Sequence, residues 1–346
     1  MAWGTPNRER RVLKAGHSSI AVTLPKPWAE AMNLRPGDSI VFDQNDDGTL
    51  FLKPAPVPGL SSGAAPYLVQ AHSFDTPGIL ERLIVGAYRV GHDAIEIRTD
   101  LPLVPERVEE LLQAARKLLG VSVVAQEPNR VLLQNFIDPS KYGLPQLVQR
   151  MKMILVAFVD EIEAVLGRHG RSRHLPTLIE EANKVLALLV RQLVLACRDW
   201  SLARRIGSPD PRQLLEWRVV VHSLGEVSEL LSSTLTTLSG GRPRASEDEA
   251  VLKEFLPELR LRLKASVEVL VRPSLEAACE AFSETARLHD AAGTAAQSLP
   301  ARARKTGIYE ATVALQRSAG CLSLLSEVAI DRAVAAGNET VLVAAA

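Results

Sequence analysis

Short apolar and β-prone runs dominate the first 54 positions of the chain. Three runs rich in Ile, Val, Thr, Leu and Phe lie at 20–24, 39–43 and 49–52. Residues 45–48, Asn-Asp-Asp-Gly, separate the last two runs, and Asp-Gly suits the positive φ angles of a hairpin turn. A short helix is expected at 26–32, between the first two runs. The pattern therefore predicts a small, strand-rich unit.

A break in composition follows this unit. Residues 54–66 contain four prolines together with Gly and Ser, which predicts a linker at 55–66. Beyond it, the periodicity predicts strand, helix, strand, helix, strand and strand, at 67–72, 76–90, 94–98, 105–119, 121–125 and 130–134. This order indicates a small α/β module at 67–138, with its helices packed on one sheet.

From residue 144 onward, apolar residues recur at helical spacing and no segment is typical of a strand. The stripes predict helices over 147–165, 178–200, 214–235 and 303–335, and a long helical segment at 246–298 that Pro273 interrupts. About six helices result. Short similarities between the second and fifth helices suggest two copies of three, at 139–242 and 243–340.

Composition narrows the class of protein. Of 346 residues, 47% are hydrophobic, which excludes disorder for most of the chain and predicts two or three domains. Lys and Arg number 40 and so do Asp and Glu, so the formal net charge is zero. Binding to nucleic acid or to an anionic membrane through bulk charge is therefore excluded, and any nucleic-acid site must be a local basic surface.

Cysteines and apolar runs indicate the compartment. Cys197, Cys279 and Cys321 are few and widely spaced within helical patterns, so we expect small buried side chains and no disulfide framework or zinc site. The N-terminal residues show no apolar signal core, and no run reaches about 18 apolar residues. We therefore expect a cytoplasmic protein without membrane insertion.

One local surface departs from neutrality. Residues 1–26 hold five cations against Glu9 alone, a local net charge of +4. A Gly-His-Ser-Ser stretch at 16–19 adds hydroxyl donors. Cations and hydroxyls on a β-ribbon can contact phosphates and base edges. The alternative, a solvated charged strand without a ligand, remains open from composition alone.

The order of residues in this region resembles a known DNA-binding family. Residues 11–28, Arg-Val-Leu-Lys-Ala-Gly-His-Ser-Ser-Ile-Ala-Val-Thr-Leu-Pro-Lys-Pro-Trp, followed by Leu34-x-Pro36-Gly37-Asp38 and Gly48-Thr49-Leu50, are similar to the AbrB/MazE/SpoVT domain. The resemblance implies a homodimer whose two chains interlace their hairpins into one β-barrel. It also implies DNA contact by the N-terminal strand and the following loop, which here corresponds to Arg10, Arg11, Lys14, Ser18, Ser19 and Lys26.

The helical part resembles a second family. Residues 179–203, from Ile-Glu-Glu-Ala-Asn to Trp-Ser-Leu-Ala, are similar to the second helix of PhoU, a phosphate-uptake regulator built from two three-helix bundles. The whole chain is similar to archaeal-type PhoU-like transcriptional regulators. The implied fold is multidomain α+β, with an AbrB-like barrel, a small α/β module and a PhoU-like pair of three-helix bundles.

The acidic motifs of that second family are incomplete here. PhoU bundles hold iron or zinc through E-x3-D pairs, but these positions are Gly225 and Glu229 in one helix and Gln316 and Gly320 in another. Asn183 stands where an Asp is expected. We therefore expect no metal cluster and no cofactor. His222, Glu226 and Glu229 remain weak metal-ligand candidates, with a solvated helix edge as the alternative.

These patterns favour a non-enzymatic regulator. No nucleophile–base pair, phosphate-binding loop or dense ligand cluster is recognisable, which argues against an enzyme. We expect a homodimeric, DNA-binding transcriptional regulator, concerned with phosphate homeostasis on the resemblance alone. The alternative is an adaptor for a phosphate transporter or a sensor kinase, in which the AbrB-like segment serves only for dimerisation.

Overall fold

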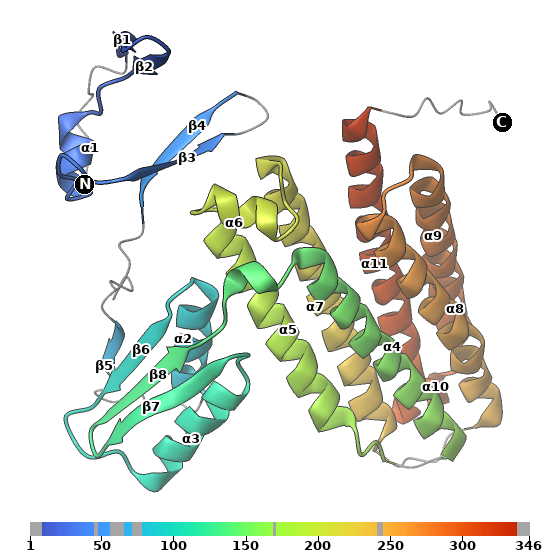
Figure 1. Cartoon of the computed structure of the whole chain (residues 1–346). Coiled ribbons are helices and arrows are strands. Elements are labelled where there is room, and N and C mark those ends of the chain that lie inside the picture. The colour runs from blue at the N-terminus through green and yellow to red at the C-terminus, as the bar shows by residue number, and fades with distance from the viewer. Residues whose placement is uncertain are drawn as a thin grey trace. The chain divides into compact units, whose positions relative to one another are not determined.

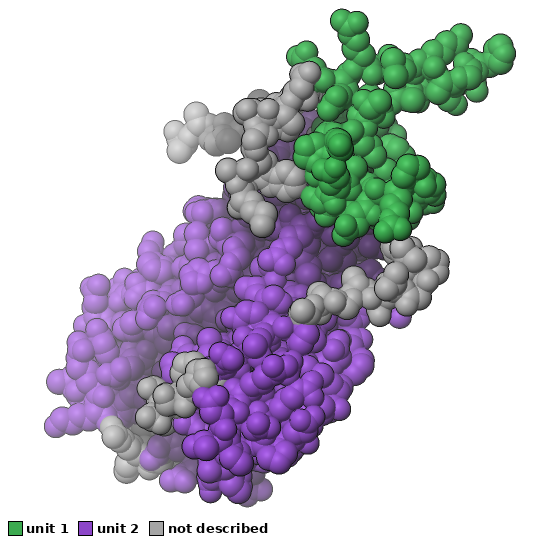
Figure 2. Space-filling model, turned by 90° about the vertical axis from the view of Figure 1, so that its left-hand side faces the viewer, with its two compact units in different colours: residues 1–64 green, residues 65–346 purple. Residues whose placement is uncertain are grey.

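The computed structural model describes residues 9–44, 48–55, 66–70, 78–168, 171–240 and 245–337. The chain divides into two compact units, residues 1–64 and 65–346, which Figure 2 distinguishes by colour. The first is rich in strands and the second is mostly helical. The multidomain α+β class expected from the sequence is confirmed at this level.

The N-terminal unit consists of two hairpins and one short helix. Strands β1 (Leu13–Ala15) and β2 (Ser19–Ala21) form an antiparallel pair, helix α1 (Lys26–Ala31) follows, and β3 (Ile40–Gln44) pairs antiparallel with β4 (Leu50–Pro54). Strands β2, β3 and β4 and helix α1 lie close to their predicted positions, although β2 is shorter, and β1 lies outside the three predicted apolar runs. Part of the predicted turn, 45–47, lies outside the described residues. The barrel requires two chains and stays a prediction.

The α/β module begins the second unit (Figure 1). Its elements are β5 (Tyr67–Gln70), α2 (Ile79–Arg89), β6 (Ala94–Arg98), α3 (Pro105–Arg116), β7 (Val121–Glu127) and β8 (Arg130–Asn135). The strand order is β5-β6-β8-β7, with β5 parallel to β6 and the other pairs antiparallel. The predicted order of strands and helices is confirmed, and the first residues of the helix predicted over 76–90 lie outside the described residues.

The apolar core of the module lies between its two helices and its sheet. Ile84 and Tyr88 of α2 and Leu111 of α3 are buried, as are alternate residues of the central strands, Ile95, Ile97, Val131 and Leu133. Both helices lie on the same face of the sheet (Figure 1). Apolar residues at helical spacing thus meet apolar residues at every second strand position, which buries one face of each element.

The remaining chain is helical apart from short connections. Its elements are the 3-10 turn η1 (Pro139–Lys141), α4 (Leu144–Arg168), α5 (Leu175–Ala196), α6 (Trp200–Arg205), α7 (Pro211–Leu238), α8 (Ser246–Val271), α9 (Leu275–Ser298), α10 (Ala301–Thr306) and α11 (Ile308–Ala336). Helices α4, α5 and α7 pack on one another, as do α8, α9 and α11. In addition, α7 contacts α11 and α4 contacts α8.

Small residues occupy more than half of the buried positions of helix α11. Ala311, Ala319 and Ala329 are almost fully buried, and Ser326 donates to the Ser266 hydroxyl of α8 at 3.3 Å. The Ser323 hydroxyl likewise donates to Thr285 of α9 at 2.9 Å. Small side chains allow the backbones to approach, and the hydroxyl pairs satisfy the polar groups buried between them.

Two helices expected to be continuous are divided. The second stripe, predicted over 178–200, ends at Ala196, and Asp199 starts α6 by accepting hydrogen bonds from the backbone N–H groups of Ser201 and Leu202 at 3.0 and 3.2 Å. The last helix, predicted over 303–335, is split at Gly307, whose φ is +83°. An N-cap and a left-handed glycine each end helical geometry locally, even where the apolar stripe continues.

The predicted burial of the cysteines is wrong. Cys197 and Cys279 are exposed and Cys321 is half-buried, and all three are free thiols. Cys197 is the C-cap of α5, one position beyond the last buried residue of that helix. Apolar character alone therefore misplaced these side chains.

Arg191 of α5 connects the helices to the α/β module. Its side chain is 2% exposed, and Nη1 donates to the backbone carbonyls of Tyr88 at 2.6 Å and His92 at 2.9 Å. Nη2 forms an ion pair with Asp93, and the guanidinium lies 4.9 Å from the centre of the Tyr88 ring. One buried cation thus holds the C-terminal end of α2 against α5.

No helix within the described ranges has the length and apolar character needed to cross a membrane.

Candidate nucleic-acid interface

Three of the six residues expected to contact DNA lie in the first hairpin, and two more precede it. Lys14 lies in β1 and Ser19 in β2, and Ser18 lies in the turn between them. Arg10 and Arg11 precede β1, which begins at Leu13. In the register of the pair, Lys14 is opposite Ile20 and Ala15 is opposite Ser19. Residues that face each other in the pair lie on the same side of the ribbon, so Ser19 shares a side with Ala15. Lys14 is the neighbour of Ala15 in β1, and it therefore projects from the opposite side.

The cations expected to contact DNA are exposed. Arg10, Arg11 and Lys14 are all exposed, and none forms an ion pair with a residue that the structure describes. Lys26 lies apart from the hairpin, as the first residue of α1. Its Nζ is 3.7 Å from Glu30, and both side chains are highly exposed, so solvent screens this pair.

The charge on this short segment is strongly one-sided. Residues 9–26 hold four cations against one carboxylate, a net charge of +3. A two-stranded ribbon fits the DNA major groove, and exposed Lys and Arg are the side chains that most often contact phosphates. The hairpin is therefore shaped and charged for a polyanion, with Lys26 as a separate contact on α1.

The same unit has a large apolar surface. A groove of about 580 Å³ is lined by Val12, Ile20, Ala21, Val22, Leu24, Ile40, Phe42, Leu50 and Leu52. Ile20 is 77% exposed and Phe42 is 62% exposed, and no described residue of 9–55 is buried. A single copy of the unit thus presents the side chains of a core without enclosing one.

The weak metal-ligand candidates do not form a site. His222 and Glu229 are exposed, and Glu226 is half-buried with its carboxylate 3.7 Å from Nη2 of Arg317. Across the part of the chain that the structure describes, no three His, Cys, Asp or Glu side chains lie close enough to hold a metal ion.

Sequence reasoning missed a basic cavity in the second unit. Arg82, Arg89, Lys117 and Asn183 contribute to its lining, from α2, the end of α3, and α5. The one sequence signal that could have drawn attention to it is the spacing of Arg82 and Arg89, which are two helical turns apart and therefore share a face of α2.

Comparison with known proteins found a family match in the first unit. Residues 13–59 match the family model described as antidote-toxin recognition MazE, bacterial antitoxin. The comparison with curated proteins and the comparison with solved structures gave no match. The matched segment spans β1 to β4 and includes Lys14, Ser18, Ser19 and Lys26. The N-terminal part of the chain is thus similar to the MazE antitoxins, which supports the AbrB/MazE-type DNA-binding domain expected there.

Proposed function

We propose that this chain is a DNA-binding transcriptional regulator that acts without catalysis. The observation that carries the proposal is a group of three exposed cations, Lys14 in the first hairpin and Arg10 and Arg11 just before it, at or just before the start of the MazE-like segment 13–59. None of the three forms an ion pair with a described residue. When such cations contact DNA phosphates, counterions are released, and this release favours binding. Because the chain as a whole has zero formal net charge, its bulk charge does not supply this free energy.

The DNA-binding form in this proposal is a homodimer. The apolar groove supports it, because a second copy would cover side chains that one copy leaves in water. Two hairpins also bind DNA more strongly than one, since binding of the second hairpin becomes intramolecular.

The regulated process in this proposal is phosphate homeostasis, with the helical region as a PhoU-like sensing or partner-binding part. Support for this finer assignment comes from the resemblance of residues 179–203 to PhoU. A partner or ligand on the second unit would act by shifting the population of DNA-binding conformations.

The test is DNA binding by the full chain. Fluorescence anisotropy with duplex DNA from upstream of its own gene, and with a scrambled duplex, is measured from about 50 to about 200 mM salt. The Arg10→Ala, Arg11→Ala, Lys14→Ala triple variant is expected to bind both duplexes at least about tenfold more weakly. Its salt slope should be shallower by about one unit for each phosphate that a removed side chain neutralised.

A matched control removes three exposed cations from the second unit. The Lys264→Ala, Arg272→Ala, Arg287→Ala variant has the same change in net charge and is expected to bind DNA like the wild type. Equal weakening in both triple variants, or no salt-dependent binding by an intact wild-type dimer, would contradict the proposal.

A second candidate function follows from the description of the matching family, which names recognition of a toxin by its antidote. An antitoxin-type regulator would bind a toxin protein in addition to DNA. Stoichiometric co-purification with a protein that arrests growth when expressed alone would favour this candidate over a regulator without such a partner.

A further inference from the structure

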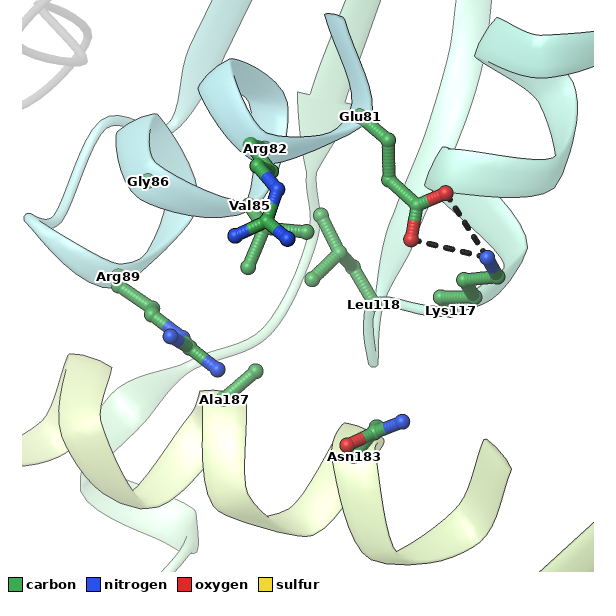
Figure 3. A pocket seen from close by; sticks show the side chains of 9 residues that line it. All are labelled: Glu81, Arg82, Val85, Gly86, Arg89, Lys117, Leu118, Asn183 and Ala187. Atoms are coloured by element: carbon green, nitrogen blue, oxygen red, sulfur yellow. Dashed lines mark hydrogen bonds and ion pairs between the residues drawn. The ribbon is translucent and has the colours of Figure 1, made fainter. Parts of the chain in front are cut away.

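A basic cavity in the second unit has no role in the DNA-binding proposal. It encloses about 360 Å³ between α2, the end of α3 and α5, which is the size of many small-molecule sites. Figure 3 shows Arg82 and Arg89 projecting from α2, with Asn183 on α5 across the same space. Residues from three helices thus surround one hollow.

The charges around this cavity are unbalanced. Glu81 is its one lining carboxylate, and both of its oxygens accept from Nζ of Lys117, at 2.8 and 2.9 Å. Neither Arg82 nor Arg89 forms an ion pair with any residue that the structure describes. Apart from the Lys117–Glu81 pair, the lining thus holds two arginine charges that no described carboxylate balances.

A third guanidinium adds to this field. Arg89 keeps much of its surface exposed, yet partial burial lowers the pKa of its guanidinium, and the nearby charge of Arg218 on α7 lowers that pKa further. Arg218 likewise has no ion-pair partner in the described part of the chain. Like charges held near one another raise the free energy of the empty site, and a bound anion would relieve this repulsion.

Gly86 contributes to the cavity wall without a side chain. It lies within α2 between the two arginines, and a Cβ atom built there would meet nothing within 4 Å. A glycine inside a helix is unfavourable relative to alanine, and no neighbouring atom in the described structure requires its small size. Its absent side chain instead leaves space for a ligand.

We propose that this cavity binds a small organic anion through its phosphate or carboxylate group. Arg82 and Arg89 present planar guanidinium groups that suit either oxyanion, and the Asn183 amide supplies a neutral polar contact from α5. The cavity volume exceeds what an inorganic oxyanion fills, so the ligand has an organic body. Because the anion would touch both α2 and α5, the site gives the sensing role of the proposed function a location, and to that extent it rests on that function.

The test is direct binding to the full chain, measured by isothermal titration calorimetry at constant ionic strength. Glycerol 3-phosphate and succinate are the probes, and inorganic phosphate and chloride are the comparison anions. Saturable binding of either organic probe, tighter than that of inorganic phosphate, is expected, and the stronger of the two probes identifies the anionic group. No saturable binding of either organic probe at millimolar concentration would overturn the proposal.

Variants locate the binding. Arg82→Ala with Arg89→Ala is expected to weaken the preferred probe at least about tenfold, and Asn183→Asp, which places a carboxylate opposite the arginines, should weaken it similarly. Arg116→Ala, an exposed arginine of α3 outside the lining, is the matched control and should leave binding unchanged. Unchanged binding in both the double variant and Asn183→Asp would overturn the site.

The readout separates this proposal from the DNA-binding proposal. Titration of the probe requires no DNA, so probe binding by a chain that fails to bind DNA would contradict only the proposed function. Conversely, DNA binding by a chain that takes up neither probe would contradict only the anion site.

Discussion

Tyr88 and Arg191 are two of the side chains at which the α/β module contacts the helices. Tyr88 is fully buried, its hydroxyl donates to the carbonyl of Leu119 at 3.1 Å, and the Arg191 guanidinium lies against its ring. Burial raises the pKa of Tyr88 to about 12, and the positive charge of Arg191 opposes the rise. The phenolate form is therefore disfavoured in the folded chain relative to the unfolded one.

This shift predicts a loss of stability in alkali. Unfolded Tyr ionises near pH 10, and folded Tyr88 near pH 12, so the unfolded state releases its proton first and the free energy of unfolding falls between those values. In Tyr88→Phe this contribution is absent. The free energy of unfolding of the wild type, relative to that of Tyr88→Phe, should therefore fall by about 1 kcal/mol between neutral pH and about pH 11. Urea unfolding of both proteins at each pH measures this change.

The variant itself serves as the control for other groups. Lys and other Tyr residues titrate equally in both proteins, so only the difference between them reports Tyr88. A difference that stays constant from neutral pH to the alkaline end would show that burial does not hold the phenol in its neutral form.

At the scale of elements, Gly307 decides where the last helix begins. Its φ of +83° is accessible to glycine and strained for other residues, and a Cβ atom there would collide with the methyl group of Thr237 on α7. The break between α10 and α11 is therefore set both by the backbone at this position and by the close approach of α7.

Substitution of this glycine should be costly. Gly307→Ala is expected to lower the free energy of unfolding by about 2–4 kcal/mol, which combines left-handed strain with overpacking. Gly337→Ala, at a φ of +69° with open space around it, isolates the strain and should cost about 1 kcal/mol. Adding Thr237→Ala to Gly307→Ala should restore part of the free energy of unfolding, because it removes the methyl group that the new Cβ meets. An equal loss of stability in Gly307→Ala and Gly337→Ala would contradict a steric contribution at Gly307.

The sequence predicted elements better than their interruptions and contacts. Strands β6 to β8 and helices α8 and α9 lie within a few residues of their predicted positions, because apolar periodicity reflects which faces are buried. The break at Asp199 was missed because it depends on a local side-chain cap, and the break at Gly307 because it depends on contact with a distant helix.

The candidate sites divide in the same way. The cations of the first hairpin are consecutive enough in sequence to be recognised as one surface, and the structure leaves them exposed. The cavity brings together Arg82, Lys117 and Asn183, which are each more than thirty residues apart in sequence and come from α2, the end of α3 and α5. Periodicity describes each helix separately and does not say which of them meet.

At the scale of the whole molecule, the described part of the N-terminal unit has no enclosed core in one copy. Its groove side chains, such as Ile20 and Phe42, stay largely in water. A glutamate at an exposed surface position of a monomer changes stability little, whereas the same change at a dimer interface buries a charge without a partner.

This contrast gives a test of dimerisation. Ile20→Glu is expected to convert the proposed dimer to a monomer in light scattering coupled to gel filtration. DNA binding should weaken at least about tenfold, because a monomer holds the duplex with one hairpin only. Leu101→Glu in the second unit is the matched control, because Leu101 is also 77% exposed and lies outside the groove. An Ile20→Glu protein that remains a dimer would contradict assembly through this groove.

The position of α11 has a consequence for how the chain folds during its synthesis. The helix contacts α7, α8 and α9, yet it is the last of these four to leave the ribosome. Until residue 336 has emerged, the faces of the three earlier helices that α11 covers stay open to other nascent chains and to chaperones. Completion of the helical unit therefore waits for translation to pass α11, and slow codons after α9 would prolong the interval in which the unit is open to aggregation.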